Sequence, residues 1–137
     1  MPVLEKILLD IEPLVVSYAA PEALLRVRWL GYHDADSAKR DCQLLLNYLP
    51  DAPCRRMIND SSEVYGEWWE AAEWIGREFA PQLAARGVRY VAWIQSMDWP
   101  SRHAIASALP HIQGVELRAF DFDEQLAAHA WLLSCPV

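Results

Sequence analysis

The sequence has few of the residues from which several common kinds of functional site are built. Its 137 residues include five glycines, and none of these belongs to a Gly-rich loop of the kind that holds phosphate in nucleotide-binding proteins. The three cysteines contain no Cys-x-x-Cys pair, so we expect free thiols rather than a zinc or redox site. The four histidines are scattered, without the spacing of a metal-binding helix, and we expect them on the surface. We therefore predict no metal and no cofactor.

Positive charge and long apolar runs are scarce as well. Twelve Lys and Arg residues stand against nineteen Asp and Glu, so the formal net charge of −7 opposes the attraction to phosphate on which nucleic-acid binding depends. No apolar run approaches the roughly 18 residues of a membrane span, and the first ten residues lack the basic and apolar sections of a signal peptide. We expect a cytoplasmic protein that neither binds nucleic acid nor inserts into a membrane.

What the sequence does contain indicates one globular domain. Hydrophobic residues make up 53% of the chain and charged residues 23%, which is an ordinary globular composition. Because 137 residues suit a single core, we take 1–137 as one domain, with 1–13 as an N-terminal extension. The runs at 14–18 and 23–31 flank an Ala-Pro-Glu segment and predict an antiparallel hairpin.

Helix and strand patterns alternate after the hairpin. Helices are predicted from Asp34 or Asp36 to Leu49 and over 67–83, 101–109 and 123–133, and strands over 54–60, 88–95 and 114–121. The run 88–95 is apolar almost throughout, as a central strand covered on both faces should be. The predicted fold class is α/β: a mainly parallel sheet of four to five strands, with an antiparallel hairpin at its N-terminal edge and about four flanking helices.

Polar residues stand where three of these strands end. In parallel sheets, ligands bind beyond the carboxyl ends of the strands, so these positions are candidates for a site. They are Asp60, Ser61 and Ser62, then Ser96 and Asp98, and then Asp121. We expect them to share one rim, either as a switch or binding loop or as residues that cap backbone N–H groups in exposed turns.

Seven tryptophans are the most unusual feature of the composition. Trp29 and Trp93 lie in predicted strands, and we expect both in the core. One helix stripe cannot bury both Trp69 and Trp74, and Trp99 stands in a predicted loop, so at least one of these three should be partly exposed. Three uses remain open for them: a subunit interface, the wall of a pocket between helices, or plain burial.

Several segments, taken in order, resemble the SpoIIAA-like family of small bacterial STAS-type proteins. The resemblance covers about residues 14–133. It consists of a strand ending in Val27, Trp29 and Gly31, an Asp closing the third strand (Asp60), a Trp-containing helix leading to a Gly-Val turn (Trp74, Gly87, Val88), and a Phe-Asp pair ahead of a helix that ends in Trp-Leu (Phe120, Asp121, Trp131, Leu132). The resemblance implies a sheet flanked by helices, often paired as a homodimer, without established enzyme activity.

Related STAS domains act on regulatory protein partners through a Ser in an Asp-Ser-Ser-Gly loop, which Asp60-Ser61-Ser62 resembles. Here Glu63 replaces the Gly, and a phosphoserine between Asp60 and Glu63 would meet like charges. The main hypothesis is a non-enzymatic regulatory protein-interaction domain, with or without this serine switch. The alternative is a carrier of a small hydrophobic ligand or lipid in an aromatic-lined pocket between helices. An enzyme would require a His or Lys close to Asp60 or Ser61.

Overall fold

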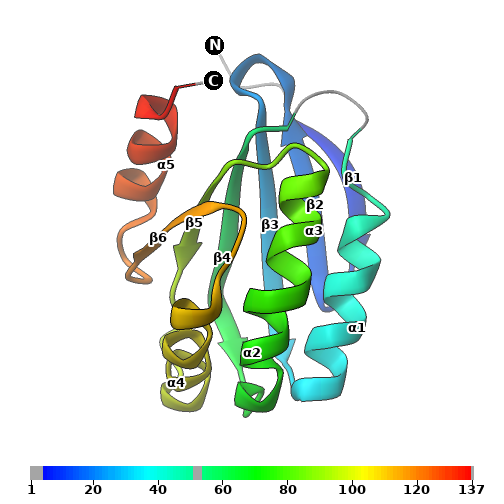
Figure 1. Cartoon of the computed structure of the whole chain (residues 1–137), viewed down its shortest axis with the longest axis vertical. Helices are drawn as coiled ribbons and strands as arrows, with labels where there is room; N and C mark the ends of the chain where they lie inside the picture. Colours follow the sequence, from blue (N-terminus) through cyan, green and yellow to red (C-terminus); the bar gives the residue numbers. More distant parts are fainter. Residues whose placement is uncertain (1–4, 51–53, 137) are drawn as a thin grey trace.

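A six-stranded sheet in the order β1-β2-β3-β4-β5-β6 forms the centre of the protein (Figure 1). The structure, a computed structural model, describes residues 5–50 and 54–136. The strands are β1 (Glu5–Ile11), β2 (Leu14–Ala19), β3 (Leu24–Tyr32), β4 (Arg56–Tyr65), β5 (Tyr90–Ile94) and β6 (Glu116–Phe120). Pairing is antiparallel from β1 to β3 and parallel from β3 to β6. The predicted fold class is therefore confirmed, with β5 between β4 and β6 as expected for a central strand.

Strand β1 was not predicted. It arises from residues that we assigned to an N-terminal extension, and it pairs with β2 along the edge of the sheet. The sequence gives little sign of it because its register shifts between Ile7 and Leu9, so apolar and polar side chains do not alternate along it. Most of its side chains are exposed or half-buried, as in an edge strand.

The helices follow the predicted positions with shifted ends. They are α1 (Ala35–Leu46), α2 (Ala72–Trp74), α3 (Ala80–Ala85), α4 (Trp99–Ala108) and α5 (Gln125–Ser134). Asp34 is the N-cap of α1: its carboxylate accepts a hydrogen bond from the Ser37 backbone N–H at 2.8 Å, and the Ser37 hydroxyl accepts one from the Asp34 N–H. This capping box explains why α1 begins at Ala35.

The predicted helix over 67–83 is one irregular segment. A 3₁₀ turn (Trp69–Ala71) leads into α2, a π-helical stretch (Ile75–Phe79) follows, and α3 completes it. Pro81 has no N–H to donate within this helix, and the Gly76 carbonyl instead accepts a hydrogen bond from the Gln113 N–H at 3.2 Å. A Cβ at Gly76 would lie 2.5 Å from the His111 backbone, so the close approach requires glycine here.

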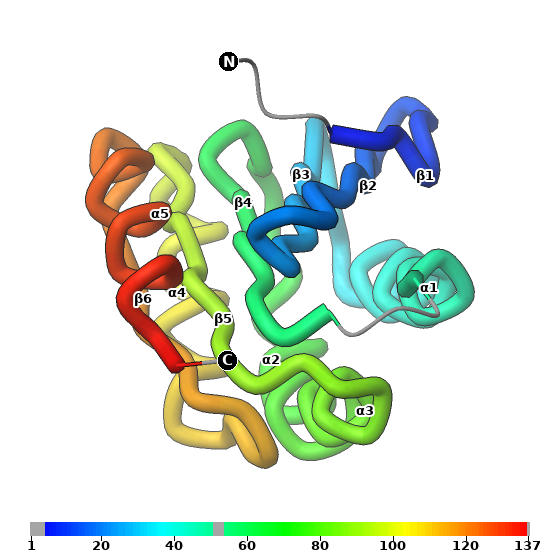
Figure 2. Tube along the Cα trace, turned by 90° about the horizontal axis from the view of Figure 1, so that it is seen from above, coloured from blue at the N-terminus to red at the C-terminus, as the bar shows by residue number. Residues whose placement is uncertain are grey.

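Helices cover both faces of the sheet. α5 lies on one side of β4 and β5, and α1 and α3 lie on the other (Figure 2). The larger core fills the space beneath α1, α2, α3 and α4 and includes Trp29 and Trp93, as predicted. The smaller core lies beneath α5, where Ile58, Ile94 and Leu132 are fully buried.

Strand β4 continues five residues beyond its predicted end. Asp60 pairs with Arg28 of β3, and Glu63 pairs with Leu30, so Ser61 and Ser62 together stand opposite Trp29. This extra residue is a β-bulge, a feature often found beside functional sites. The prediction that residues 60–62 form a loop was wrong, because these residues lie inside β4.

Two glycines with positive φ offer a matched test of the turn that follows β4. Gly66 has φ +116°, and a Cβ there would lie 2.4 Å from the His33 carbonyl oxygen, whereas Gly31 has φ +77° with open space around it. We expect Gly31→Ala to lower the free energy of unfolding by about 1–2 kcal/mol through backbone strain alone. Gly66→Ala should lower it by clearly more, because backbone atoms must also move apart. Urea denaturation of both variants measures this, and equal losses would contradict the packing of His33 against Gly66.

Candidate functional site

The polar residues predicted at the strand ends do meet at one edge of the sheet. Asp98 is the N-cap of α4, and its carboxylate accepts hydrogen bonds from the N–H groups of Ser101 (3.3 Å) and Gly66 (3.0 Å). The Ser96 hydroxyl donates to the Val64 carbonyl at 2.6 Å and accepts from the Asp98 N–H at 2.9 Å. These bonds tie the end of β4 to the segment between β5 and α4.

The carboxylates of Asp121 and Asp60 are also occupied by neighbouring groups. Arg102 donates to Asp121 Oδ1 at 2.6 Å, and this bond lowers the pKa of the Asp121 carboxyl below its ordinary value. Asp60 is buried, and its two oxygens accept from the Ser62 N–H (2.9 Å) and from Gln125 Nε2 (3.1 Å). In the part of the chain that the structure describes, no three His, Cys, Asp or Glu residues are grouped as metal ligands. The rim residues therefore hold the loops in place.

Ser61 and Ser62 differ sharply in their surroundings. Ser61 is 4% exposed, and its hydroxyl accepts the indole N–H of Trp93 at 3.0 Å. Ser62 is half-buried, and the next residue, Glu63, is exposed and paired with Arg28 at 2.8 Å. The reading of these serines as caps in an exposed turn was wrong for Ser61, because its hydroxyl points into the core.

Large aromatic side chains are exposed around the same edge. Trp69 is 51% exposed and Trp99 is 75% exposed, whereas Trp74 is half-buried and stacks on Phe79 with ring centroids 6.2 Å apart. Of the three tryptophans predicted for an interface or pocket, two are thus available to a partner at this edge. Three further exposed side chains accompany them: Tyr32, Tyr65 and Met97.

These five exposed residues, Tyr32, Tyr65, Trp69, Met97 and Trp99, form what we call the aromatic face. The rings of Tyr32 and Tyr65 lie 5.9 Å apart. The hydrogen bond from Gly66 to Asp98 places the end of β4 beside the segment that carries Met97 and Trp99, and the 3₁₀ turn that starts at Trp69 packs against α4. The five residues therefore come from neighbouring segments, namely the ends of β3 and β4, the 3₁₀ turn at Trp69 and the start of α4.

Acidic residues flank the aromatic face. Glu67 and Glu70, on either side of Trp69 in the chain, are exposed and make no ion pair within residues 5–50 and 54–136. Asp36 is exposed in the first turn of α1, close in sequence to Tyr32. Carboxylates that are exposed therefore lie beside the face, in agreement with the net charge of −7.

A cavity of about 40 Å³ lies in the larger core, next to the β4 bulge. Its walls come from β3, β4, β5, α1 and the irregular helix. They are lined by Trp29, His33, Ala38, Cys42, Asn59, Ser61, Val64, Trp68, Ile75, Phe79 and Trp93. This cavity is lined by Trp29, Trp68 and Trp93, and not by Trp69, Trp74 or Trp99, the tryptophans that we considered as the wall of a pocket.

The indole N–H groups of these three tryptophans all donate to polar side chains. Trp29 donates to Asn59 Oδ1 at 2.7 Å, Trp93 to Ser61 Oγ and Trp68 to Ser101 Oγ, both at 3.0 Å. A buried indole needs such an acceptor. The sequence held a signal for this arrangement that we missed. Asn59 and Ser61 are two residues apart and so lie on one face of β4, where each can accept a hydrogen bond from a Trp on a flanking strand.

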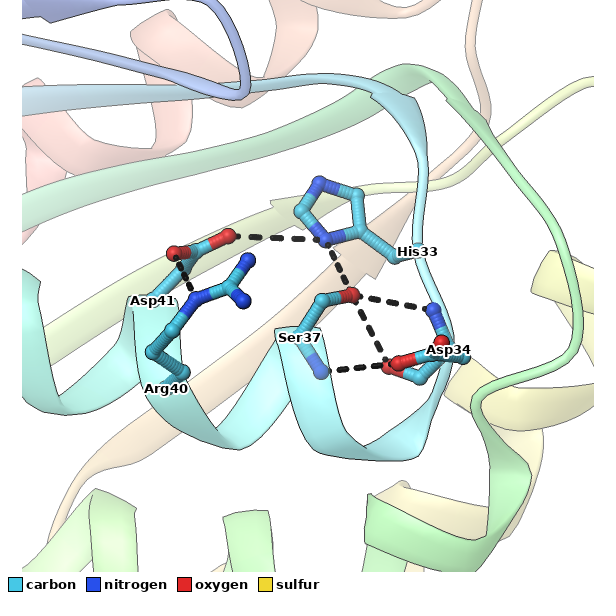
Figure 3. A network of polar contacts seen from close by, with 5 residues as sticks. All are labelled: His33, Asp34, Ser37, Arg40 and Asp41. Atoms are coloured by element: carbon cyan, nitrogen blue, oxygen red, sulfur yellow. Dashed lines mark hydrogen bonds and ion pairs between the residues drawn. The ribbon is translucent and has the colours of Figure 1, made fainter.

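His33 completes the wall of the cavity, and the expectation of a surface histidine was wrong for it. The residue is 3% exposed, and its ring packs edge-on against Trp29 at 5.8 Å. Its Nδ1 lies 3.4 Å from Ser37 Oγ and 3.8 Å from Asp41 Oδ2. Figure 3 shows this nitrogen directed towards α1 and the other ring nitrogen directed away from it. Among the described residues, Nε2 has no hydrogen-bond partner.

Burial determines the protonation of His33 and of the cysteines. Removal from water lowers the pKa of His33 below its ordinary value of 6.5, although the nearby Asp41 carboxylate acts in the opposite direction. Burial also raises the pKa of the Cys42 thiol, which lines the cavity, and it raises the pKa of Cys54 to about 12. Cys42 is thus a core residue, and its thiol is not activated for nucleophilic attack.

Ser61 and Ser62 offer a matched pair for testing the contacts of the bulge. Ser61→Ala removes the acceptor of a buried indole N–H and should lower the free energy of unfolding by about 1–3 kcal/mol. Ser62→Ala removes a half-buried hydroxyl and should change it by less than about 0.5 kcal/mol. Urea denaturation followed by far-UV circular dichroism measures both values. Equal effects would show that the Trp93–Ser61 hydrogen bond contributes nothing specific.

The lowered pKa of His33 predicts a loss of stability on acidification. Between its folded pKa and the value of 6.5, the unfolded chain binds the proton more readily, so the free energy of unfolding decreases as the pH falls below about 6.5. The variant His33→Gln lacks this contribution. Carboxylates with a lowered pKa, such as Asp121, titrate at lower pH and do so in both the wild type and the variant. Urea denaturation at pH 7.5, 6.5 and 5.5 should show a steeper decline in the wild type. Parallel profiles would contradict the prediction.

The sequence is similar to one known protein family over most of its length. The model of the SpoIIAA-like family matches residues 24–133, which include β3 to β6, helices α1 to α4 and all but the last residue of α5. No curated protein and no solved structure matched the chain. Across residues 5–50 and 54–136, none of the helices combines the length and the apolar character needed to cross a membrane. The family match covers most of the chain, and the protein belongs to the SpoIIAA-like family, whose fold is that of STAS-type regulatory domains.

Proposed function

We propose that this protein is a non-enzymatic regulatory domain that binds a protein partner through its aromatic face. The observation that carries the proposal is the grouping of Trp69 and Trp99 with Tyr32, Tyr65 and Met97 at one end of the sheet. Aromatic side chains and Met are enriched in interface cores, where their burial supplies much of the binding energy. Membership of the SpoIIAA-like family supports a regulatory role in general.

The charges around the face indicate what kind of partner it fits. Glu67 and Glu70 repel an acidic surface and attract a basic one. Arg and Lys side chains also bind favourably over exposed indole rings, where cation–π attraction contributes about 0.5–1 kcal/mol. The partner that fits both features is a segment with Arg or Lys next to apolar residues.

A homodimer through the same face is the competing arrangement, and the family resemblance is its support. A symmetric contact would bring Glu67 and Glu70 of both copies towards one another, and this repulsion opposes the gain from burying the indoles. We therefore favour a different chain as the partner.

A serine switch and an enzyme activity have less support than binding through the aromatic face. Of the two serines, Ser62 is the one with an accessible side chain, and its phosphate would stand between Asp60 and Glu63. The serine switch therefore stays a prediction that rests on Ser62. Ser61 and His33 line one cavity, but no hydrogen bond joins them among the described contacts, and the Ser61 hydroxyl is occupied by Trp93. This geometry lacks the paired nucleophile and base of a hydrolase.

Replacement of the two most exposed indoles tests the proposal. The probe is a synthetic peptide with alternating Lys and Leu residues, and its control replaces each Lys by Glu. We expect the basic peptide to shift the indole N–H resonances of Trp69 and Trp99, and to bind at least tenfold more weakly to Trp69→Ala/Trp99→Ala. Leu126→Ala is the matched control, because Leu126 is 86% exposed but lies outside the aromatic face. Binding should weaken at high salt.

Two outcomes would contradict this proposal. One is equal binding of the acidic and basic peptides, or binding that the double variant leaves unchanged. The other is a dimer in analytical ultracentrifugation that the double variant dissociates and Leu126→Ala does not, which would make the aromatic face a contact between two copies of this chain.

A further inference from the structure

We propose that two copies of this protein pair through the outer edge of strand β6, in a two-fold antiparallel contact centred on Leu117 that joins their sheets into one. β6 is the last strand of the sheet and pairs with β5 alone within the residues that the structure describes (Figure 1). The contact leaves out the residues of the aromatic face, so it does not depend on the partner proposed for that face.

The backbone of β6 carries hydrogen-bonding groups that no neighbouring strand uses. The Glu116 N–H donates to the Arg89 carbonyl, and the Phe120 carbonyl accepts from the residue after β5, so every second residue of β6 directs its backbone groups towards β5. Leu117 and Ala119 therefore direct theirs outwards, because backbone groups alternate between the two sides of a strand. Within residues 5–50 and 54–136, these outward groups have no hydrogen-bond partner. Such an edge readily accepts another strand.

An apolar groove lies beside this edge. Its volume is about 360 Å³, and its lining consists of Leu109, Ile112, Val115, Leu117 and Ala119. All five side chains are exposed or half-buried. Helix α5 packs over β5 more than over β6, which leaves room for a further strand. Alternate side chains of a strand that pairs with β6 would lie against this groove and cover it.

Two opposite charges on the other face of β6 indicate which strand fits. Glu116 and Arg118 are exposed on the side of α5, and neither forms an ion pair in the described part of the chain. The Arg118 guanidinium lies 5.2 Å from the centroid of the Phe120 ring. In an antiparallel pair centred on Leu117, Glu116 of each copy stands opposite Arg118 of the other. Side chains approach closely at such a position, because it is a non-hydrogen-bonded pair.

The same charges select this register against its neighbours. A symmetric pair centred on Arg118 would place the two guanidinium groups opposite one another, and a pair centred on Glu116 would do the same with the two carboxylates. Like charges directly opposite are destabilising. A peptide with charges of one sign would match one of these two residues and repel the other. The edge is therefore complementary to itself, as a two-fold contact between identical chains requires.

Two charge reversals test the contact as a complementary pair. Glu116→Lys gives a strand with two positive charges and Arg118→Glu a strand with two negative charges, so each variant alone should dimerise at least tenfold more weakly than the wild type. In an equimolar mixture the positive strand faces the negative one, and the dimer should return. Sedimentation velocity measures all four samples. Arg86→Glu, a reversal at an exposed residue outside β6, is the control and should leave the dimer unchanged.

A backbone variant and a backbone measurement keep the test decisive if a charge reversal disturbs folding. Leu117→Pro removes an outward N–H without removing a hydrogen bond to β5, and it should also weaken the dimer at least tenfold. In the wild type, the amide protons of Leu117 and Ala119 should exchange with solvent more slowly at high protein concentration than at low concentration. The Arg118 amide, which bonds to β5, should be protected at both.

Three results would overturn the inference. A wild type that stays monomeric up to about 1 mM would leave the edge of β6 to a different chain. A mixture of the two charge variants that is no more dimeric than either one would exclude the register. A dimer that Trp69→Ala/Trp99→Ala dissociates and Leu117→Pro does not would place the contact on the aromatic face, and would contradict the preceding proposal as well.

Discussion

The fold depends on the hydrogen bonds that join buried indoles to strand β4. Trp29 of β3 donates to Asn59, and Trp93 of β5 donates to Ser61, so the strand between them must carry polar side chains on a face that is otherwise apolar. Because a buried indole N–H without an acceptor is costly, these two bonds select one register of β4 against both neighbours. The bulge at Ser61 and Ser62 shifts the alternation of the strand, so that Val64 rather than Glu63 follows Ser61 on this face, and a space that side chains do not fill lies beside it.

The same interactions explain which parts of the fold the sequence predicted and which parts it did not. Alternating and continuous apolar runs predicted the parallel sheet and the central position of β5, because those patterns report burial directly. The segment from Asp60 to Glu63 was misread because Asp and Ser favour turns locally, whereas here pairing with β3 and the hydrogen bond from Trp93 to Ser61 hold the segment in a strand. Strand β1 was missed because its register shift removes the alternation. His33 carries no local signal at all, since its burial results from contacts with Trp29 of β3 and with Ser37 and Asp41 of α1.

For the candidate site, the sequence predicted where the polar residues lie but not which groups they contact. Sequence order was enough to place Asp60, Ser96, Asp98 and Asp121 at one rim, because the carboxyl ends of parallel strands lie together. It could not show that these side chains would accept hydrogen bonds from nearby backbone N–H groups and from Arg102 or Gln125. For the aromatic face, the sequence predicted the exposure of some members but not the membership of others. At least one of Trp69, Trp74 and Trp99 was expected to be exposed, whereas Tyr32 and Tyr65 are brought together by the tertiary structure.

Trp68 and Trp69 are consecutive in the chain, yet one lines the interior cavity and the other belongs to the surface that we assign to a partner. Because the two residues share one peptide unit, the packing of the first indole in the core also fixes where the second indole stands on the surface.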